Sequence, residues 1–212
     1  MSDDSDCEEE EYNEEEIKVI LIGSTGVGKT SIINVITGGK FNINEKSTEG
    51  SSFLMKKIKV NEKEYILNIW DTIGQEKLRQ LTKIFYNNSK LVIFVYDITS
   101  KESFEDLNYW TKDVEEQIGK DTIKGVVANK IDLYLNEKVT TDEGKNYAKS
   151  IQANFIEFSA KTEPPSKFED FLIELLEKYL PKKTDTKNNK KIVLKKSDLS
   201  KGKKPLKCCK SD

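Results

Sequence analysis

A glycine-rich stretch from Gly23 to Thr30 constrains the fold of this chain more than any other feature. It reads Gly-Ser-Thr-Gly-Val-Gly-Lys-Thr and matches the pattern G-x-x-x-x-G-K-[ST]. An apolar run at 17–22 precedes it, and a helical pattern over about 29–37 follows. Glycines let such a loop turn its backbone N–H groups inward, where they and the helix N-terminus bind phosphate oxygens. The sequence therefore predicts a nucleoside triphosphate site in a strand–loop–helix unit.

This phosphate loop (residues 23–30) suggests specific roles for its side chains. We expect Lys29 to pair with the β- and γ-phosphates and the Thr30 hydroxyl to ligate Mg²⁺. A chance match on a flexible loop is the alternative, and the flanking strand and helix argue against it. The predicted phosphate contacts come from Ser24, Thr25, Gly26, Val27, Gly28, Lys29, Thr30 and Ser31. The loop alone does not select the base.

Strand and helix patterns alternate along the rest of the chain. Strands are expected at about 52–60, 64–70, 91–98, 123–130 and 154–158, and helices at about 102–118, 142–150 and 167–180. Asn61 and Glu62 mark a turn between the first two of these strands, and Pro181 marks the end of the folded part. Such alternation predicts an α/β protein with the P-loop NTPase fold. Its sheet would be doubly wound, mostly parallel and six-stranded, with helices on both faces.

The tetrapeptide Asn129-Lys130-Ile131-Asp132 follows a buried strand, at the edge of the sheet where ligands of such folds bind. The Asp132 carboxylate can accept both donors of guanine, N1–H and the N2 amine, whereas adenine offers no such pair. Asn129 can bond the other side of the ring system, and the Lys130 stem would lie over the purine. A polar surface turn is the alternative for these residues taken alone. Ser159, Ala160 and Lys161 form a third loop after the last strand.

Two further segments are expected to respond to the γ-phosphate. Asp71 stands at a strand end, where it can hold Mg²⁺ through water, and Gly74 and Gln75 follow in the sequence. The Gly74 N–H can sense the γ-phosphate and Gln75 can orient the attacking water, which makes Gln75 and Lys29 the candidate catalytic residues. The Thr48 hydroxyl, in the loop after the first helix, can complete the Mg²⁺ shell. Losing the γ-phosphate would release both loops.

These motifs, in this order and spacing, make the chain similar to the small GTPases of the Ras superfamily. It looks most like a Rab protein, because WDT at 70–72 and FVYDIT at 94–99 are close to Rab segments. The resemblance covers about residues 16–180 and implies a GTP/GDP switch that uses Mg²⁺. It also places Phe41 edge-on to the guanine.

The chain departs from the Rab pattern in the switch segments. Glu49 and Ser52 replace an isoleucine and an aspartate, which makes the usual partner-facing surface more polar. Ile73 stands where the family has alanine, next to the γ-phosphate, so turnover or switch closure is expected to suffer. Glu45 replaces an aromatic residue, which leaves the nucleotide less covered. Thr25 is an ordinary Rab variation.

The two ends of the chain carry opposite charge. Residues 1–16 hold ten acids and no base, whereas residues 181–212 hold twelve lysines and three aspartates. Like-charged runs stay solvated and often act as interaction segments. We therefore expect an acidic disordered leader at 1–16, a GTPase domain at 17–180 and a flexible tail at 181–212.

The cysteines all lie in these ends, as Cys7, Cys208 and Cys209, and the chain has no histidine. Disulfide or zinc support of the body and imidazole catalysis are therefore excluded. The ending Cys-Cys-Lys-Ser-Asp resembles that of Rab proteins, which implies geranylgeranylation of Cys208 and Cys209 and, with the lysines, anchoring to a lipid membrane. The alternatives are a solvated tail with two ordinary thiols or an RNA-binding arm, and we expect no nucleic-acid partner.

No run approaches the roughly 18 apolar residues of a spanning helix, and the acidic start resembles no targeting signal. We expect a cytoplasmic protein at the cytosolic face of an intracellular membrane. The resemblance implies vesicle and membrane trafficking, slow GTP hydrolysis, and four kinds of partner: an exchange factor, a GTPase-activating protein, effectors and a prenyl-chaperone. The competing interpretation is a GTP-locked membrane scaffold in which Ile73 blocks hydrolysis. An ATP-dependent kinase is disfavoured by Asp132.

Overall fold

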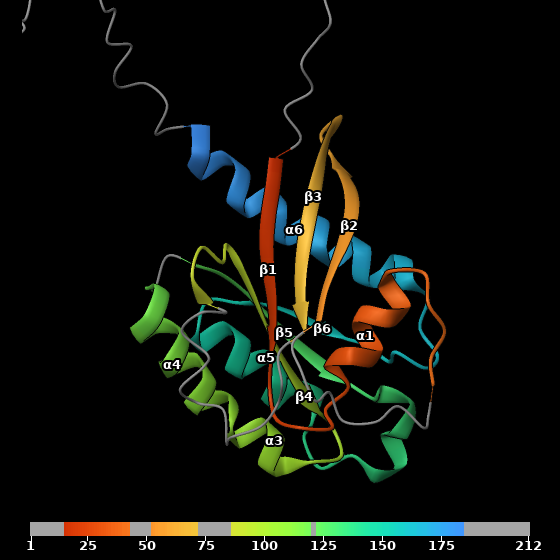
Figure 1. Cartoon of the computed structure of the whole chain (residues 1–212). Helices are drawn as coiled ribbons and strands as arrows, with labels where there is room; N and C mark the ends of the chain where they lie inside the picture. The colour runs from red at the N-terminus through yellow and green to blue at the C-terminus, as the bar shows by residue number, and fades with distance from the viewer. Residues whose placement is uncertain (1–14, 43–51, 72–85, 120–121, 185–212) are drawn as a thin grey trace, which may run out of the picture.

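The computed structural model describes residues 15–42, 52–71, 86–119 and 122–184. Six strands form one sheet in the order β2-β3-β1-β4-β5-β6, in which the β2–β3 pair is antiparallel and the other described pairs are parallel. The strands are β1 (Glu15–Ile22), β2 (Ser52–Val60), β3 (Lys63–Asp71), β4 (Leu91–Asp97), β5 (Ile123–Asn129) and β6 (Asn154–Glu157). This is the predicted α/β architecture, in which helices lie between successive parallel strands in the described part of the chain, as the helix Leu107–Ile118 does between β4 and β5 (Figure 1).

Helices cover both faces of the sheet (Figure 1). They are α1 (Lys29–Ile36), α3 (Lys101–Glu105), α4 (Leu107–Ile118), α5 (Thr141–Ser150) and α6 (Pro165–Thr184), with a 3₁₀ helix η2 (Ile131–Asn136) after β5. Apolar residues of α1 and α6 pack in one core on one face, and those of α4 and α5 pack in a second core on the other. The prediction of a doubly wound sheet is thereby confirmed.

The central strands are buried on both faces, as continuous apolar runs predict. Along β1, Val19 and Leu21 belong to the first core, whereas Ile20 and Ile22 belong to the second. All seven residues of β4 are buried. The strand ends that carry polar residues are therefore held by apolar packing on either side.

The β2–β3 hairpin has the predicted turn. Asn61 and Glu62 both have positive φ, 49° and 63°, and Val60 pairs directly with Lys63. Two central residues with positive φ make a type I′ turn, whose twist matches that of the flanking strands.

Strand β1 and helix α6 extend at least two residues beyond their predicted bounds. Strand β1 begins at Glu15 rather than 17, since the Glu15 and Glu16 carboxylates pair with side chains of the neighbouring strand β3. Helix α6 continues to Thr184, past the predicted end at Pro181. A proline removes one backbone donor, and in the last turn of a helix this costs a single hydrogen bond. Although α6 has 20 residues, no helix in the described part of the chain is long and apolar enough to cross a bilayer.

The helix predicted at 102–118 is instead two helices, α3 and α4, which meet at Asp106. Asp106 keeps right-handed helical angles, with φ −59° and ψ −21°, so the interruption is local. The Ser100 side chain caps α3 by accepting a hydrogen bond from the Ser103 N–H. This cap sets the start of the helix one residue earlier than predicted.

Helix α5 approaches β4 closely at Gly144. A Cβ atom there would lie 2.3 Å from the Tyr96 Oη and 2.7 Å from the Phe155 ring. The Tyr96 hydroxyl is buried and has no hydrogen-bond partner among the described residues. Burial raises the pKa of this phenol, with the nearby carboxylates adding to the effect, so it stays protonated. The absence of a side chain at Gly144 is therefore what lets α5 pack over Tyr96.

We expect Gly144→Ala to lower the free energy of unfolding by about 2 kcal/mol, because overpacking outweighs the better helix propensity of alanine. Tyr96→Phe alone should change it by less than about 1 kcal/mol, since the lost hydroxyl makes no hydrogen bond. The double variant should recover part of the Gly144→Ala loss. Urea denaturation of the four proteins measures these effects, and a double variant no more stable than Gly144→Ala would contradict the packing argument.

Candidate nucleotide-binding site

The phosphate loop leaves the central strand β1 and wraps into α1. Gly26 and Gly28 have φ of 79° and 98°, a region that side chains rarely adopt. A Cβ atom at Gly28 would lie 2.3 Å from the Asn129 Nδ2. Gly28 also caps α1, and its carbonyl accepts the first helical hydrogen bond, from the Ile32 N–H. The conformation of the loop therefore depends on glycine at this position.

The Lys29 side chain folds back over the start of the phosphate loop. Its Nζ donates to the Gly23 carbonyl at 2.7 Å and to the Ser24 carbonyl at 3.0 Å, and the residue is 5% exposed. Burial lowers the pKa of Lys29 to about 8, although the Asp71 charge acts in the opposite direction. Phosphate oxygens arriving at the loop would supply a counter-charge for this ammonium.

The two described candidates for Mg²⁺ ligands lie together. The Thr30 hydroxyl donates to the Asp71 Oδ2 at 2.6 Å, which joins the first turn of α1 to the end of β3. A hydroxyl and a carboxylate oxygen are the hard donors that Mg²⁺ prefers, and Mg²⁺ in phosphate-transfer sites takes few protein ligands. Within the described residues no group of three or more His, Cys, Asp or Glu could hold a metal. The Thr30–Asp71 pair suits a metal that also binds phosphate.

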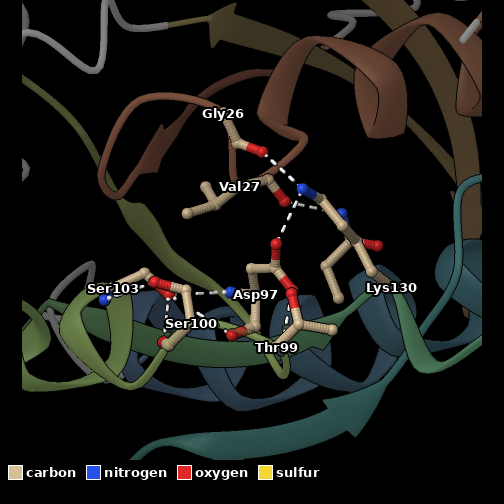
Figure 2. Close-up of polar contacts among 8 residues, drawn as sticks. Gly26, Val27, Asp97, Thr99, Ser100, Ser103 and Lys130 are labelled. Carbon is tan, nitrogen blue, oxygen red and sulfur yellow. Dashed lines mark hydrogen bonds and ion pairs between the residues drawn. The ribbon is translucent and has the colours of Figure 1, made fainter. Parts of the chain in front are cut away.

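The residues predicted for the base come from the end of β5 and reach the phosphate loop. Asn129 is 1% exposed, and its Nδ2 donates to the Val27 carbonyl at 2.7 Å. Lys130 has a left-handed backbone, and its Nζ donates to the Gly26 carbonyl at 2.7 Å (Figure 2). The segment 129–132, here called the base loop, thus binds two backbone carbonyl groups of the phosphate loop through its side chains.

Asp132 is held by the loop after β6. Its Oδ1 accepts a hydrogen bond from the Ser159 Oγ at 2.6 Å, and the Lys161 Nζ lies 3.9 Å from its Oδ2. The Ser159 Oγ in turn accepts from the N–H groups of Lys161 and Thr162, both at 3.2 Å. The third predicted loop therefore converges on the carboxylate that is expected to recognise the base.

The remaining predicted residues fall into two groups. The first group lies within the described residues. The Ser24 Oγ donates to the Asp106 Oδ2 at 2.5 Å, and Phe41 packs against the first core. Thr25 is exposed, Ser31 on α1 is half-buried, and Ala160 is buried. The other group lies outside the described residues, and its roles remain predictions. These residues are Glu45, Thr48, Glu49, Ile73, Gly74, Gln75, Cys7, Cys208 and Cys209.

Sequence reasoning missed two aspartates. Asp97 forms an ion pair with Lys130, with 2.7 Å between its Oδ2 and the Nζ, and Asp106 holds Ser24. Asp97 ends a buried strand, as Asp71 and Asn129 do, so its position was a usable signal. Asp106 lies inside a helical pattern, where nothing in the sequence marks it.

Comparison with known proteins identifies the family. The Ras family profile matches residues 18–181. Ras-related protein Rab-12 of Homo sapiens is 40% identical over 146 residues, which are 68% of this chain and 60% of the relative. Ras-related protein Rab-18 of Caenorhabditis elegans is 42% identical over 147 residues, 69% of this chain and 72% of the relative. GTP-binding protein ypt3 of Schizosaccharomyces pombe is 37% identical over 154 residues, 73% of this chain and 72% of the relative.

The family match spans the phosphate loop, the base loop and the loop after β6, so it covers every described part of the site. The chain therefore belongs to the Ras family of small GTPases, and within that family it groups with the Rab proteins.

Proposed function

We propose that this chain binds GTP and GDP and works as a molecular switch that hydrolyses GTP slowly. One observation carries the proposal: Asn129 and Lys130 of the base loop donate hydrogen bonds to Val27 and Gly26 of the phosphate loop. A purine nucleotide has to reach from a phosphate site to a base site, and these contacts set the two sites side by side. The ligand crosses the carboxyl ends of β1 and β5, where ligands of open α/β sheets bind.

Guanine is the base that this site favours. The Asp132 carboxylate, fixed by Ser159, accepts hydrogen bonds from N1–H and the N2 amine. An adenine ring offers this partly buried carboxylate no such pair of donors, and losing a hydrogen bond to a charged group costs about 1.5–3 kcal/mol.

Hydrolysis in this site rests on positioning and charge stabilisation. Lys29 and the loop N–H groups bind the β- and γ-phosphates, and Thr30 and Asp71 hold Mg²⁺, with Thr48 as a further proposed ligand. When bound, Mg²⁺ neutralises charge on the phosphate oxygens. Gln75 orients the water that attacks the γ-phosphorus, and the bond to the β-phosphate oxygen breaks to give GDP and phosphate. Neither the phosphate loop nor the first switch segment, around Thr48, contains an arginine, so a stabilising arginine, if the reaction uses one, would come from a partner protein.

The proposed setting is the cytosolic face of an intracellular membrane, in vesicle trafficking. The domain from β1 to α6, residues 15–184, would form the switch, and the tail that follows, prenylated at Cys208 and Cys209, would anchor it. The Rab relatives and the twelve lysines of the tail support this setting. An exchange factor, a GTPase-activating protein, effectors and a prenyl-chaperone are the proposed partners.

Single-turnover hydrolysis of Mg²⁺–GTP by the full chain tests this function. We expect slow hydrolysis in the wild type, loss of hydrolysis in Gln75→Leu, and faster hydrolysis in Ile73→Ala because the bulk beside the γ-phosphate is removed. Wild-type protein that does not bind GTP would refute the proposal.

The same experiment tests the alternative function, a GTP-locked membrane scaffold, which Ile73 favours. GTP that binds but stays intact in the wild type, with turnover restored by Ile73→Ala, would establish the scaffold. Hydrolysis by the wild type that is lost in Gln75→Leu would exclude it.

A further inference from the structure

The tip of the Lys130 side chain is held at two points. Its Nζ lies 2.7 Å from the Gly26 carbonyl oxygen and 2.7 Å from the Asp97 Oδ2 (Figure 2). The backbone of Lys130 has a φ of 67°, a left-handed conformation that aims the side chain back toward the phosphate loop. The side chain is about one-third exposed, so the ion pair is partly shielded from water.

Hydrogen bonds from both its side chain and its backbone hold Asp97 in place. Its Oδ1 accepts hydrogen bonds from the Thr99 N–H and the Thr99 hydroxyl, both at 2.8 Å, and its backbone N–H donates to the Ser103 Oγ at 3.1 Å. The residue is 8% exposed and stands opposite Asn129 in the β4–β5 register. Oδ1 therefore holds the turn before α3, while Oδ2 faces Lys130.

We infer that Asp97 is a positioning residue for nucleotide retention, acting through Lys130. This inference rests on the proposed function, in which the Lys130 stem lies over the purine. Lysine has a long side chain with several rotatable bonds, and ordering such a chain on binding costs free energy. Asp97 and the Gly26 carbonyl order it before the nucleotide arrives. Asp97 touches neither the base nor the phosphates in this role.

The two carboxylate oxygens of Asp97 have different partners, so the contact with Lys130 can be removed on its own. Asp97→Asn keeps an oxygen that accepts from Thr99, so the turn before α3 remains. The new amide group faces the Lys130 ammonium donor to donor, so the second anchor is lost. Losing a hydrogen bond between charged groups should raise the dissociation rate of bound nucleotide by about 10-fold.

Dissociation of fluorescent N-methylanthraniloyl-GDP from the full chain, chased with excess GDP, measures this effect. The cycle comprises wild type, Asp97→Asn, Lys130→Met and the double variant. Lys130→Met keeps an unbranched apolar stem and removes the ammonium. We expect Asp97→Asn to speed dissociation about 10-fold in the wild-type background and less than about 2-fold in the Lys130→Met background.

Two controls separate positioning from a general loss of structure. Asp142→Asn removes one negative charge from the exposed first turn of α5 and should leave the dissociation rate unchanged. Single-turnover hydrolysis of pre-bound GTP should be the same in Asp97→Asn and the wild type, because Asp97 does not act on the phosphates.

An unchanged dissociation rate in Asp97→Asn would overturn the inference. So would an effect of the same size in the Lys130→Met background, which would mean that Asp97 acts on structure and not through Lys130. Failure of the wild type to bind the labelled nucleotide would instead refute the proposed function itself.

Discussion

Replacing Asp132 with asparagine is expected to lower the affinity for GTP by about 1000-fold, because two hydrogen bonds to a charged acceptor are replaced by one to a neutral acceptor and a donor–donor contact. Ser159 already donates to the Oδ1 of this side chain. An asparagine would keep its oxygen there and turn its amide group to the position of Oδ2. That position faces the N2 amine of guanine.

The same geometry predicts a gain of binding for another nucleotide. Xanthine carries N1–H and a carbonyl oxygen at C2, so it matches the oxygen and the amide group of asparagine. We expect Asp132→Asn to bind XTP at least about 10-fold more tightly than GTP.

Competition of GTP, XTP and ATP against a labelled nucleotide measures these preferences. Asp170→Asn, on helix α6, serves as the charge control, and should keep the wild-type preference for GTP. An Asp132→Asn variant that still prefers GTP to XTP would show that this carboxylate does not recognise the base.

Replacing Gly28 with alanine is expected to weaken GTP binding by about 100-fold, or nearly 3 kcal/mol. Two costs combine at this position. The φ of 98° strains any residue with a Cβ, and the added atom would lie 2.3 Å from the Asn129 Nδ2. Asn129 is buried and bound to Val27, so it cannot move away without releasing the phosphate loop from the base loop.

Gly38 supplies a matched control for the backbone strain. It has a φ of 93°, and a Cβ there meets no atom within 4 Å. Gly38→Ala should therefore lower stability through strain alone and leave GTP affinity close to that of the wild type. Titration calorimetry of both variants gives the comparison. Equal losses of affinity would mean that the Gly28–Asn129 contact is unimportant.

The fold and the outline of the site could be predicted because their signals are local. Apolar runs identified β1, β4 and β5, and the residues at or just after their carboxyl ends meet at one edge of the sheet, as at Asn129. The glycines of the phosphate loop indicated a tightly wrapped backbone, and the structure gives Gly26 and Gly28 positive φ.

The contacts between loops could not be predicted, since they depend on the register of neighbouring strands. Asp97 ends a strand as Asp71 does, but only the pairing of β4 with β5 sets it opposite Asn129 and next to Lys130. The Ser24–Asp106 hydrogen bond joins residues 82 positions apart. Neither residue type nor spacing carries that information, so the sequence interpretation assigned Ser24 to a phosphate and left Asp106 out.

The burial of β1 on both faces bears on the order in which a bound nucleotide is released. Strand β1 lies between β3 and β4, and its amide hydrogens should exchange with solvent only when the whole domain unfolds. The phosphate loop starts at the end of this strand, whereas the base is met by loops that follow β5 and the edge strand β6. Local unfolding should therefore affect the loops after β5 and β6, which contact the base, before it affects the phosphate loop. A nucleotide leaving this protein would loosen at its guanine end while its phosphates are still held.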